Sequence, residues 1–152
     1  MTLLLSGLPE AVGDGEELAR FLTQSGHYSR ASADAAGSVR PSAFLPSSKD
    51  RATSVSRHGR EPLEDLRTIG GLAAGGRSLY GAAILTAAAV RDTGLEVHAD
   101  EPPERHALIG GWPWVDNDPE LQKAQQKERA LLLASASGPP FLFTPSPGPR
   151  EP

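Results

Sequence analysis

The sequence predicts a small α+β domain, with a mostly antiparallel sheet and helices packed on one face. Three observations support this fold class. The chain has 152 residues, which is about one domain. Hydrophobic residues make up 38% of it, enough for one modest core. Short strand-like segments and segments of helical periodicity are separated by turn residues. We expect the domain to span residues 1–136 and the proline-rich residues 137–152 to form a flexible tail.

The first predicted helix covers residues 14–24. Asp14 can cap it, and two glutamates follow in the first turn, where the helix dipole favours them. Leu18, Phe21 and Leu22 recur at i, i+3 and i+4, which is the spacing of one helix face. The loop expected at 25–41 is rich in serine, alanine and glycine.

Two further helices are predicted at 62–69 and 119–135. Pro62 suits the first turn of the former, and Gly70-Gly71 should end it. Asp118 can cap the latter. Its predicted apolar side consists of Leu121, Ala124, Leu131, Leu132 and Ala134.

Five segments are predicted strands: 42–45, 52–57, 80–90, 95–98 and 106–109. Turn residues at 47–50 favour a hairpin between the first two. The turn at 91–94 favours a second hairpin between 80–90 and 95–98. The segment 80–90 contains five alanines and also fits a buried helix; the clean alternation of 95–98, which needs a neighbour, favours the strand.

The net charge of −4 argues against a protein that mainly grips phosphate backbones. Residues 20–60 nevertheless carry seven basic and two acidic residues, so a local basic patch for nucleic acid stays open. The absence of cysteine excludes disulfides and thiolate chemistry. The chain starts without a basic region or a long apolar run, and no segment is long enough to span a membrane. We therefore expect a cytoplasmic protein with no membrane association.

Gly71, Gly76, Arg77 and Ser78 match the spacing of a phosphate-binding loop, with arginine in place of the lysine. Arginine is a poor substitute in so tight a loop, and no buried strand precedes it. A flexible connector is the better interpretation.

His98, Asp100 and His106 are the ligand types of a metal site with two imidazoles and one carboxylate. On a strand, His98 and Asp100 would point to the same side, and His106 could fold back across Pro102-Pro103. Many turns carry such residues, so surface or capping roles compete with metal binding. We expect no cofactor.

Ser54, Ser56 and His58, with Asp50 or Asp100, could form a nucleophilic site, but no nucleophile-elbow motif is present. An anion site is the alternative at this place. It would use Arg30, Arg57 and Arg60 near His27 and His58. A plain polar loop competes with both hypotheses.

Trp112 and Trp114 flank a proline after two glycines. Such a pair suits an exposed contact surface, because tryptophan is enriched at interface hot spots and stacking platforms. The alternative is that one of them fills the core, since aromatic residues make up only 5% of the chain.

A series of segments over residues 18–136 resembles a family of short, uncharacterised bacterial proteins. The series is Arg20-Phe21-Leu22, Ser42-Ala43-Phe44 with Pro46, Ser54-Val55-Ser56-Arg57, Tyr80-Gly81, Arg91-Asp92-Thr93-Gly94-Leu95 with Val97, and His106-Ala107-Leu108-Ile109-Gly110. The resemblance implies one small α+β unit in a bacterial cytoplasm, and it carries no activity over to any residue.

From these patterns we expect a non-catalytic accessory protein of a bacterial or phage system that binds another macromolecule, a protein in the first place. Its binding residues would be Trp112, Trp114, Arg30, Arg57 and Arg60. The runner-up is a small hydrolase or transferase with a site centred on His58, His98 and His106, which must then converge in one pocket. The third hypothesis, nucleic-acid contact through residues 20–60, requires the arginines there to share one face.

Overall fold

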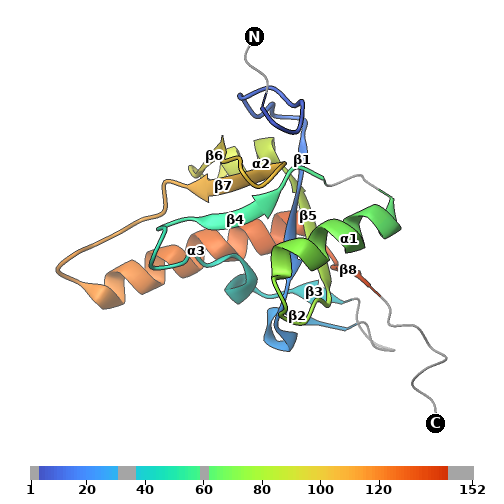
Figure 1. Cartoon of the computed structure of the whole chain (residues 1–152). Helices are drawn as coiled ribbons and strands as arrows, with labels where there is room; N and C mark the ends of the chain where they lie inside the picture. Colours follow the sequence, from blue (N-terminus) through green and yellow to red (C-terminus); the bar gives the residue numbers. More distant parts are fainter. Residues whose placement is uncertain (1–3, 31–36, 59–61, 144–152) are drawn as a thin grey trace.

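A six-stranded antiparallel sheet forms the centre of the molecule and confirms the α+β class (Figure 1). The computed structural model describes residues 4–30, 37–58 and 62–143. The strands lie in the order β6-β7-β4-β1-β5-β8. Their bounds are Glu17–Leu22 (β1), Thr53–Ser56 (β4), Gly81–Thr86 (β5), Glu96–Ala99 (β6), His106–Gly110 (β7) and Phe141–Leu142 (β8).

The remaining elements flank this sheet. Two short strands, β2 (Tyr28–Ser29) and β3 (Ser38–Val39), pair with each other where a loop was expected. The 3-10 helices are η1 (Ser25–His27) and η2 (Pro41–Phe44), and the α-helices are α1 (Leu63–Ala74), α2 (Ala87–Asp92) and α3 (Pro119–Ser137).

The helices cover both faces of the sheet, which corrects the expectation of one covered face. On one face, Leu18 and Leu22 of β1 share a core with Leu133 of α3. On the other, Phe21 of β1 packs with Leu66 of α1. In Figure 1, α1 (green) accordingly lies in front of β1 and β5, while α3 (orange) passes behind the sheet.

The helix predicted at 14–24 is wrong, because β1 occupies Glu17–Leu22. A central strand buried on both faces does not alternate between apolar and polar residues. Leu18 and Leu22 face the α3 side and Phe21 faces the α1 side, so their spacing imitates a helical stripe.

The strand predicted at 42–45 is also wrong. Pro41 starts the 3-10 helix η2 instead, and Phe44 at its end is fully buried. The expected hairpin with 52–57 therefore does not form. The strand within 52–57 is confirmed as β4, and it pairs with β7 and β1.

The segment 80–90 combines both alternatives considered for it. Its first part forms strand β5, and Thr86 then caps α2 by accepting a 3.1 Å hydrogen bond from the Ala89 amide. The strands predicted at 95–98 and 106–109 are confirmed as β6 and β7. They pair with each other, so the hairpin expected between 80–90 and 95–98 is wrong.

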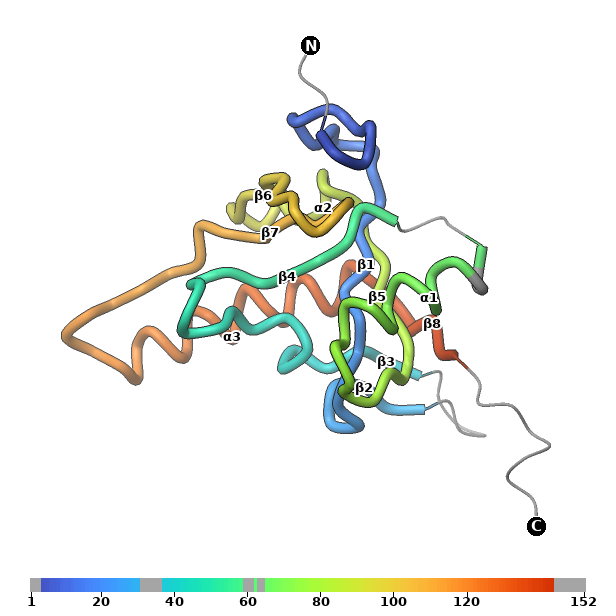
Figure 2. The backbone as a smooth tube through the Cα atoms, in the orientation of Figure 1, coloured from blue at the N-terminus to red at the C-terminus, as the bar shows by residue number. Residues whose placement is uncertain are grey.

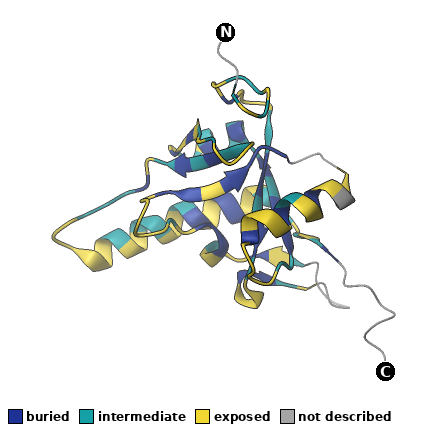
Figure 3. Ribbon diagram, in the orientation of Figure 1, coloured by how far each residue is buried: buried dark blue, intermediate teal, exposed yellow. Residues whose placement is uncertain are grey.

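Both later helices are confirmed with shifted ends. Helix α1 continues through Gly70-Gly71 and ends at Gly75, which adopts the left-handed conformation at φ 59°. Helix α3 is capped by Asp118, whose carboxylate accepts a 3.0 Å bond from the Leu121 amide. Its N-terminal half is largely exposed (Figure 3). The predicted inward residues Leu131 and Leu132 are exposed, and Leu133 is buried instead.

The two ends of the described chain are tied to the sheet. Strand β8 pairs with β5 and Phe143 is buried, so residues 141–143 belong to the domain and not to a flexible tail. Before β1, the backbone loops above the end of that strand (Figure 2). Arg57 and Glu101 fasten this loop, through hydrogen bonds to Glu16 and to Ser6 respectively.

Candidate functional site

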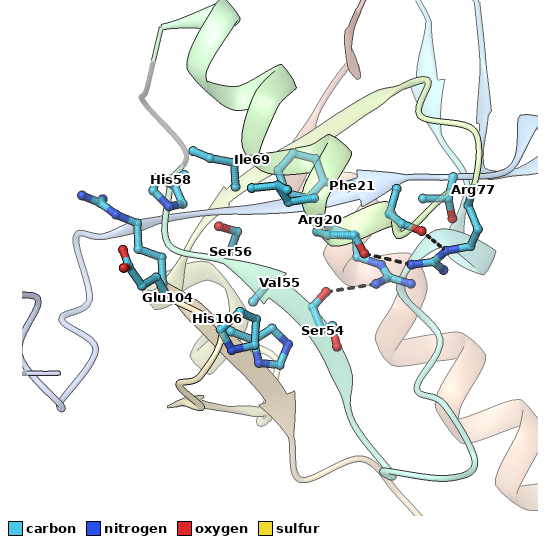
Figure 4. Close-up of a pocket in the computed structure, with 16 residues that line it drawn as sticks. Arg20, Phe21, Ser54, Val55, Ser56, His58, Ile69, Arg77, Glu104 and His106 are labelled. Carbon is cyan, nitrogen blue, oxygen red and sulfur yellow. Dashed lines mark hydrogen bonds between the residues drawn. The ribbon is translucent and has the colours of Figure 1, made fainter. Parts of the chain in front are cut away.

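A cleft of about 450 Å³ lies between the C-terminal half of α1, strand β4 and the turn between β6 and β7 (Figure 4). Its size falls in the range of about 300–1,000 Å³ that small-molecule sites occupy. Arginines line one end, at Arg20 and Arg77. Two histidines, His58 and His106, line the other. Between them the walls are largely apolar.

Arg20 reaches the cleft because β1 and β4 diverge. The only registered pair between the two strands is Ala19 with Ser56. Beyond it, Arg20 fills the gap: its Nε donates to the Ala43 carbonyl at 2.7 Å and its Nη1 to the Ser54 carbonyl at 3.0 Å. Burial, and next the positive charge of Arg77, lower the pKa of Arg20 to about 10. The guanidinium is thus charged at neutral pH.

Arg77 lies just beyond the end of α1 and turns back onto it. Its Nε donates to the Ala74 carbonyl at 2.8 Å and its Nη2 to the Ala73 carbonyl at 3.3 Å. A cation at this end suits the unpaired carbonyls and the negative pole of the helix. Figure 4 shows the Arg20 and Arg77 guanidinium groups next to each other. Among the described residues, neither group bonds to a carboxylate.

The opposite end of the cleft holds the histidines. His58 is buried, and this burial, followed by the charge of Arg105, lowers its pKa to about 4. Its imidazole is therefore neutral at pH 7. His106 is held by Asp100, whose backbone carbonyl and carboxylate lie 3.0 and 3.1 Å from Nδ1.

Ser56 is the cross-strand partner of His106 and also lines the cleft. This places a serine, a histidine and an aspartate in one row across β4, β7 and the end of β6. The Ser56 Oγ is buried and has no hydrogen-bond partner among the described residues. A buried hydroxyl is a poor nucleophile toward a ligand in the cleft, because the ligand cannot reach it without rearrangement.

The enzyme hypothesis required His58, His98 and His106 to lie in one pocket, and only two of them do. His58 and His106 line the same cleft. His98 lies apart on the exposed part of edge strand β6, where its Nε2 is 2.9 Å from the Glu96 carboxylate. The three candidates therefore do not form one pocket.

The metal site proposed from His98, Asp100 and His106 is not formed. Asp100 and His106 bond to each other, but His98 bonds to Glu96. Among the residues whose side chains the structure describes, no group of three His, Asp or Glu is arranged to hold a metal ion.

The tryptophans do not form an exposed pair. Trp112 belongs to the main core, and its Nε1 donates to the Ile109 carbonyl at 3.0 Å. Trp114 is partly buried against the same core, and the Arg51 guanidinium lies 4.6 Å from its ring centre. The contact surface predicted from these residues is wrong for Trp112, because a small core poor in aromatics uses this side chain for packing.

The arginines of residues 20–60 do not share one face. Arg57 is buried, with two hydrogen bonds of 2.8 and 2.7 Å to the Glu16 carboxylate. Arg30 lies over the Tyr28 ring at 5.8 Å in the β2–β3 hairpin, and Arg51 covers Trp114. Arg60 lies outside the described residues. Arg57 thus has a structural role, and no common anion site with Arg30 and His27 is formed.

The phosphate-binding loop suggested by Gly71 to Ser78 is absent as well, since Gly71 lies inside α1. One residue of that motif, Arg77, nevertheless reaches the cleft. Arg20 was missed as a site residue, because it stood only in the count of basic residues and in one segment of the family resemblance. An arginine within an apolar, strand-forming segment was the one available signal.

Comparisons with protein-family models, with curated proteins and with solved structures found no match for this chain. The resemblance to a family of bacterial proteins therefore stays a prediction. In the described part of the chain, no helix combines the length and apolar character that crossing a membrane requires.

Proposed function

We propose that this protein is a binding protein whose α1–β4 cleft takes a small anionic ligand. The observation that carries the proposal is the pair Arg20 and Arg77, two adjacent guanidinium groups at one end of the cleft. Among the described residues, both groups donate to backbone carbonyls and to no carboxylate.

The physical reason is the cost of uncompensated charge. Removing an ion from water costs several kcal/mol, by order of magnitude, unless an opposite charge replaces the lost solvation. Carbonyl oxygens orient Arg20 and Arg77 but carry no net charge. An oxyanion between the two would supply the missing charge and accept charge-assisted hydrogen bonds, which are about twice as strong as neutral ones.

This proposal keeps a non-catalytic binding role and changes its surface and its ligand. The protein partner expected from the sequence was to bind through two tryptophans and three arginines, but Trp112 and Arg57 among them are buried. Binding to a protein partner stays a prediction, and no surface of this protein is assigned to it. The hypothesis of nucleic-acid contact through residues 20–60 required the arginines there to share one face. Arg57 does not meet this requirement, because it is buried in an ion pair.

The proposal is tested by titrating inorganic phosphate into the 15N-labelled full chain. We expect saturable shifts of the Arg20 and Arg77 Nε–H resonances. Arg77→Gln should weaken binding about tenfold or more, because a charge-assisted hydrogen bond contributes about 1.5–3 kcal/mol. The control Lys49→Gln removes one positive charge from an exposed turn and should leave the affinity unchanged. Equal affinities in both variants would contradict the proposal.

A second candidate, a hydrolase or transferase acting in the same cleft, is favoured by the His106–Asp100 pair. A carboxylate on Nδ1 orients an imidazole for proton transfer. If this candidate holds, the protein should hydrolyse p-nitrophenyl phosphate or acetate. His106→Gln should abolish the turnover, and His98→Gln on the exposed edge strand should keep it. No turnover above buffer in the wild type would remove this candidate.

A further inference from the structure

Helix α1 presents an unusually exposed leucine to the cleft. Leu72 lies in the last turns of α1, lines the cleft and is 81% exposed. It is the most exposed of the large hydrophobic side chains in the described residues. Ile69, one turn earlier, lines the same wall, and Phe21 of β1 lies next to it (Figure 4). The cleft that holds Arg20 and Arg77 therefore also has an apolar wall, formed by Phe21, Ile69 and Leu72.

The charges of the site limit the head group. Arg20 and Arg77 carry two positive charges and bond to no described carboxylate; Glu104 lines the cleft at its histidine end. A carboxylate ligand would balance one of them, whereas a phosphate monoester, close to a dianion at neutral pH, balances both. Guanidinium forks also match the oxygens of a phosphate.

The dimensions of the site require more than a head group. The cleft measures about 450 Å³, which exceeds what a bare oxyanion fills. The space next to the arginines is bounded by Phe21, Ile69 and Leu72. Covering such side chains gains about 25 cal/mol for each Å² of apolar surface removed from water. An apolar group attached to the phosphate would supply this cover.

We infer that the ligand is an organic phosphate monoester, with its phosphate on Arg20 and Arg77 and an apolar body, of about the size of an aromatic ring, against Leu72. The inference rests on the proposed function, which it deepens from "an anion" to a stated chemical class. In this inference, Leu72 contacts the apolar body of the ligand, and the two arginines bind its phosphate.

The test compares two ligands of equal charge, methyl phosphate and phenyl phosphate, by isothermal titration or NMR with the full chain. We expect phenyl phosphate to bind about tenfold more tightly. Leu72→Gln should reduce that preference to about twofold and leave the affinity for methyl phosphate unchanged, which also shows that the variant is folded. The matched control is Leu131→Gln, at an exposed leucine of α3, and it should keep the full preference.

Each other outcome has a separate meaning. Equal affinity of the wild type for the two phosphates would overturn the inference and leave the anion site standing. A preference that Leu72→Gln does not reduce would also overturn it, because the apolar body would then lie elsewhere. If neither phosphate binds, the proposed function fails together with the inference.

Discussion

The ion pair between Glu16 and Arg57 holds the segment before β1 on the sheet, and its removal has a calculable effect. The Arg57 side chain is fully buried; its Nε and Nη2 donate to the Glu16 carboxylate at 2.8 and 2.7 Å, and its Nη1 donates to the Pro9 carbonyl at 2.9 Å. In Glu16→Ala, the Pro9 carbonyl is the one hydrogen-bond acceptor that the described residues leave to the buried guanidinium, beside the more distant charge of Glu101.

Breaking a buried ion pair from one side costs about 3–5 kcal/mol, because a charge is left without its partner. The Glu16 side chain is 28% exposed, so water can partly replace it. We therefore expect a loss near the lower end, about 3 kcal/mol in the free energy of unfolding. The loss is measured by urea unfolding followed by circular dichroism, with the slope of the transition as a check for two-state behaviour.

Two controls separate the ion pair from a general effect on the loop. Asp14→Ala breaks the more exposed Asp14–Arg91 pair, 2.6 Å long, and should cost less than about 1 kcal/mol. Glu16→Ala with Arg57→Met removes the buried charge as well and should recover at least half of the loss. A cost below about 1 kcal/mol for Glu16→Ala alone would refute the reasoning.

The same pair predicts a pH dependence. Burial raises the pKa of Glu16, but the hydrogen bonds from Arg57 and from the Gly13 amide outweigh it, so the pKa lies below its usual value. A carboxyl group with a lowered pKa stabilises the fold above its unfolded pKa, about 4.3, and loses this contribution as the pH falls through the folded value. Wild type should therefore lose more stability than Glu16→Ala on acidification below about pH 4.

Three further predictions concern single residues. Trp112→Ala should lower the free energy of unfolding in urea by about 3–5 kcal/mol, because truncating a buried aromatic side chain leaves a cavity. A stability close to that of the wild type would show that Trp112 is not a core residue. Since the pKa of His58 is lowered to about 4, the folded state resists its protonation; stability should fall from about pH 6.5 to pH 4, and His58→Gln should flatten the slope over that window. Gly81→Ala would place a methyl group against the β8 backbone at Phe141, so the Phe143 amide, which donates to Tyr80 at 2.9 Å, should exchange its hydrogen faster than in wild type.

Strands with a clear alternation and helices with clear ends could be predicted from the sequence. The alternation of 95–98 and the cap at Asp118 both correspond to real elements, because each depends on neighbours along the chain. Pairing partners could not be predicted in this way. Strand β4 pairs with β7, about fifty residues later, and no local pattern encodes that distance.

The candidate site was harder still, because its residues come from separate parts of the chain. His58 and His106 were selected for their chemistry, and the β4–β7 pairing brings them to one cleft. Trp112 and Arg57 were selected by the same logic and are structural, since a residue type suits a core or an ion pair as well as it suits a ligand. Burial alone separates these roles, and burial is a property of the whole fold.

Strand β1, where the predicted helix was wrong, also forms one end of the cleft. Residues 17–22 form a strand buried on both faces, and an arginine stands in the middle of it. This strand pairs with β4 only at Ala19 and Ser56, and Arg20 occupies the gap beyond that pair, where it donates to the Ala43 and Ser54 carbonyls. Arg20→Met would leave the Ala43 and Ser54 carbonyls without their donor, which costs about 1–3 kcal/mol for each buried acceptor. Arg20 therefore contributes to stability through these two bonds, and Arg77→Gln, which leaves them in place, tests the ligand role separately.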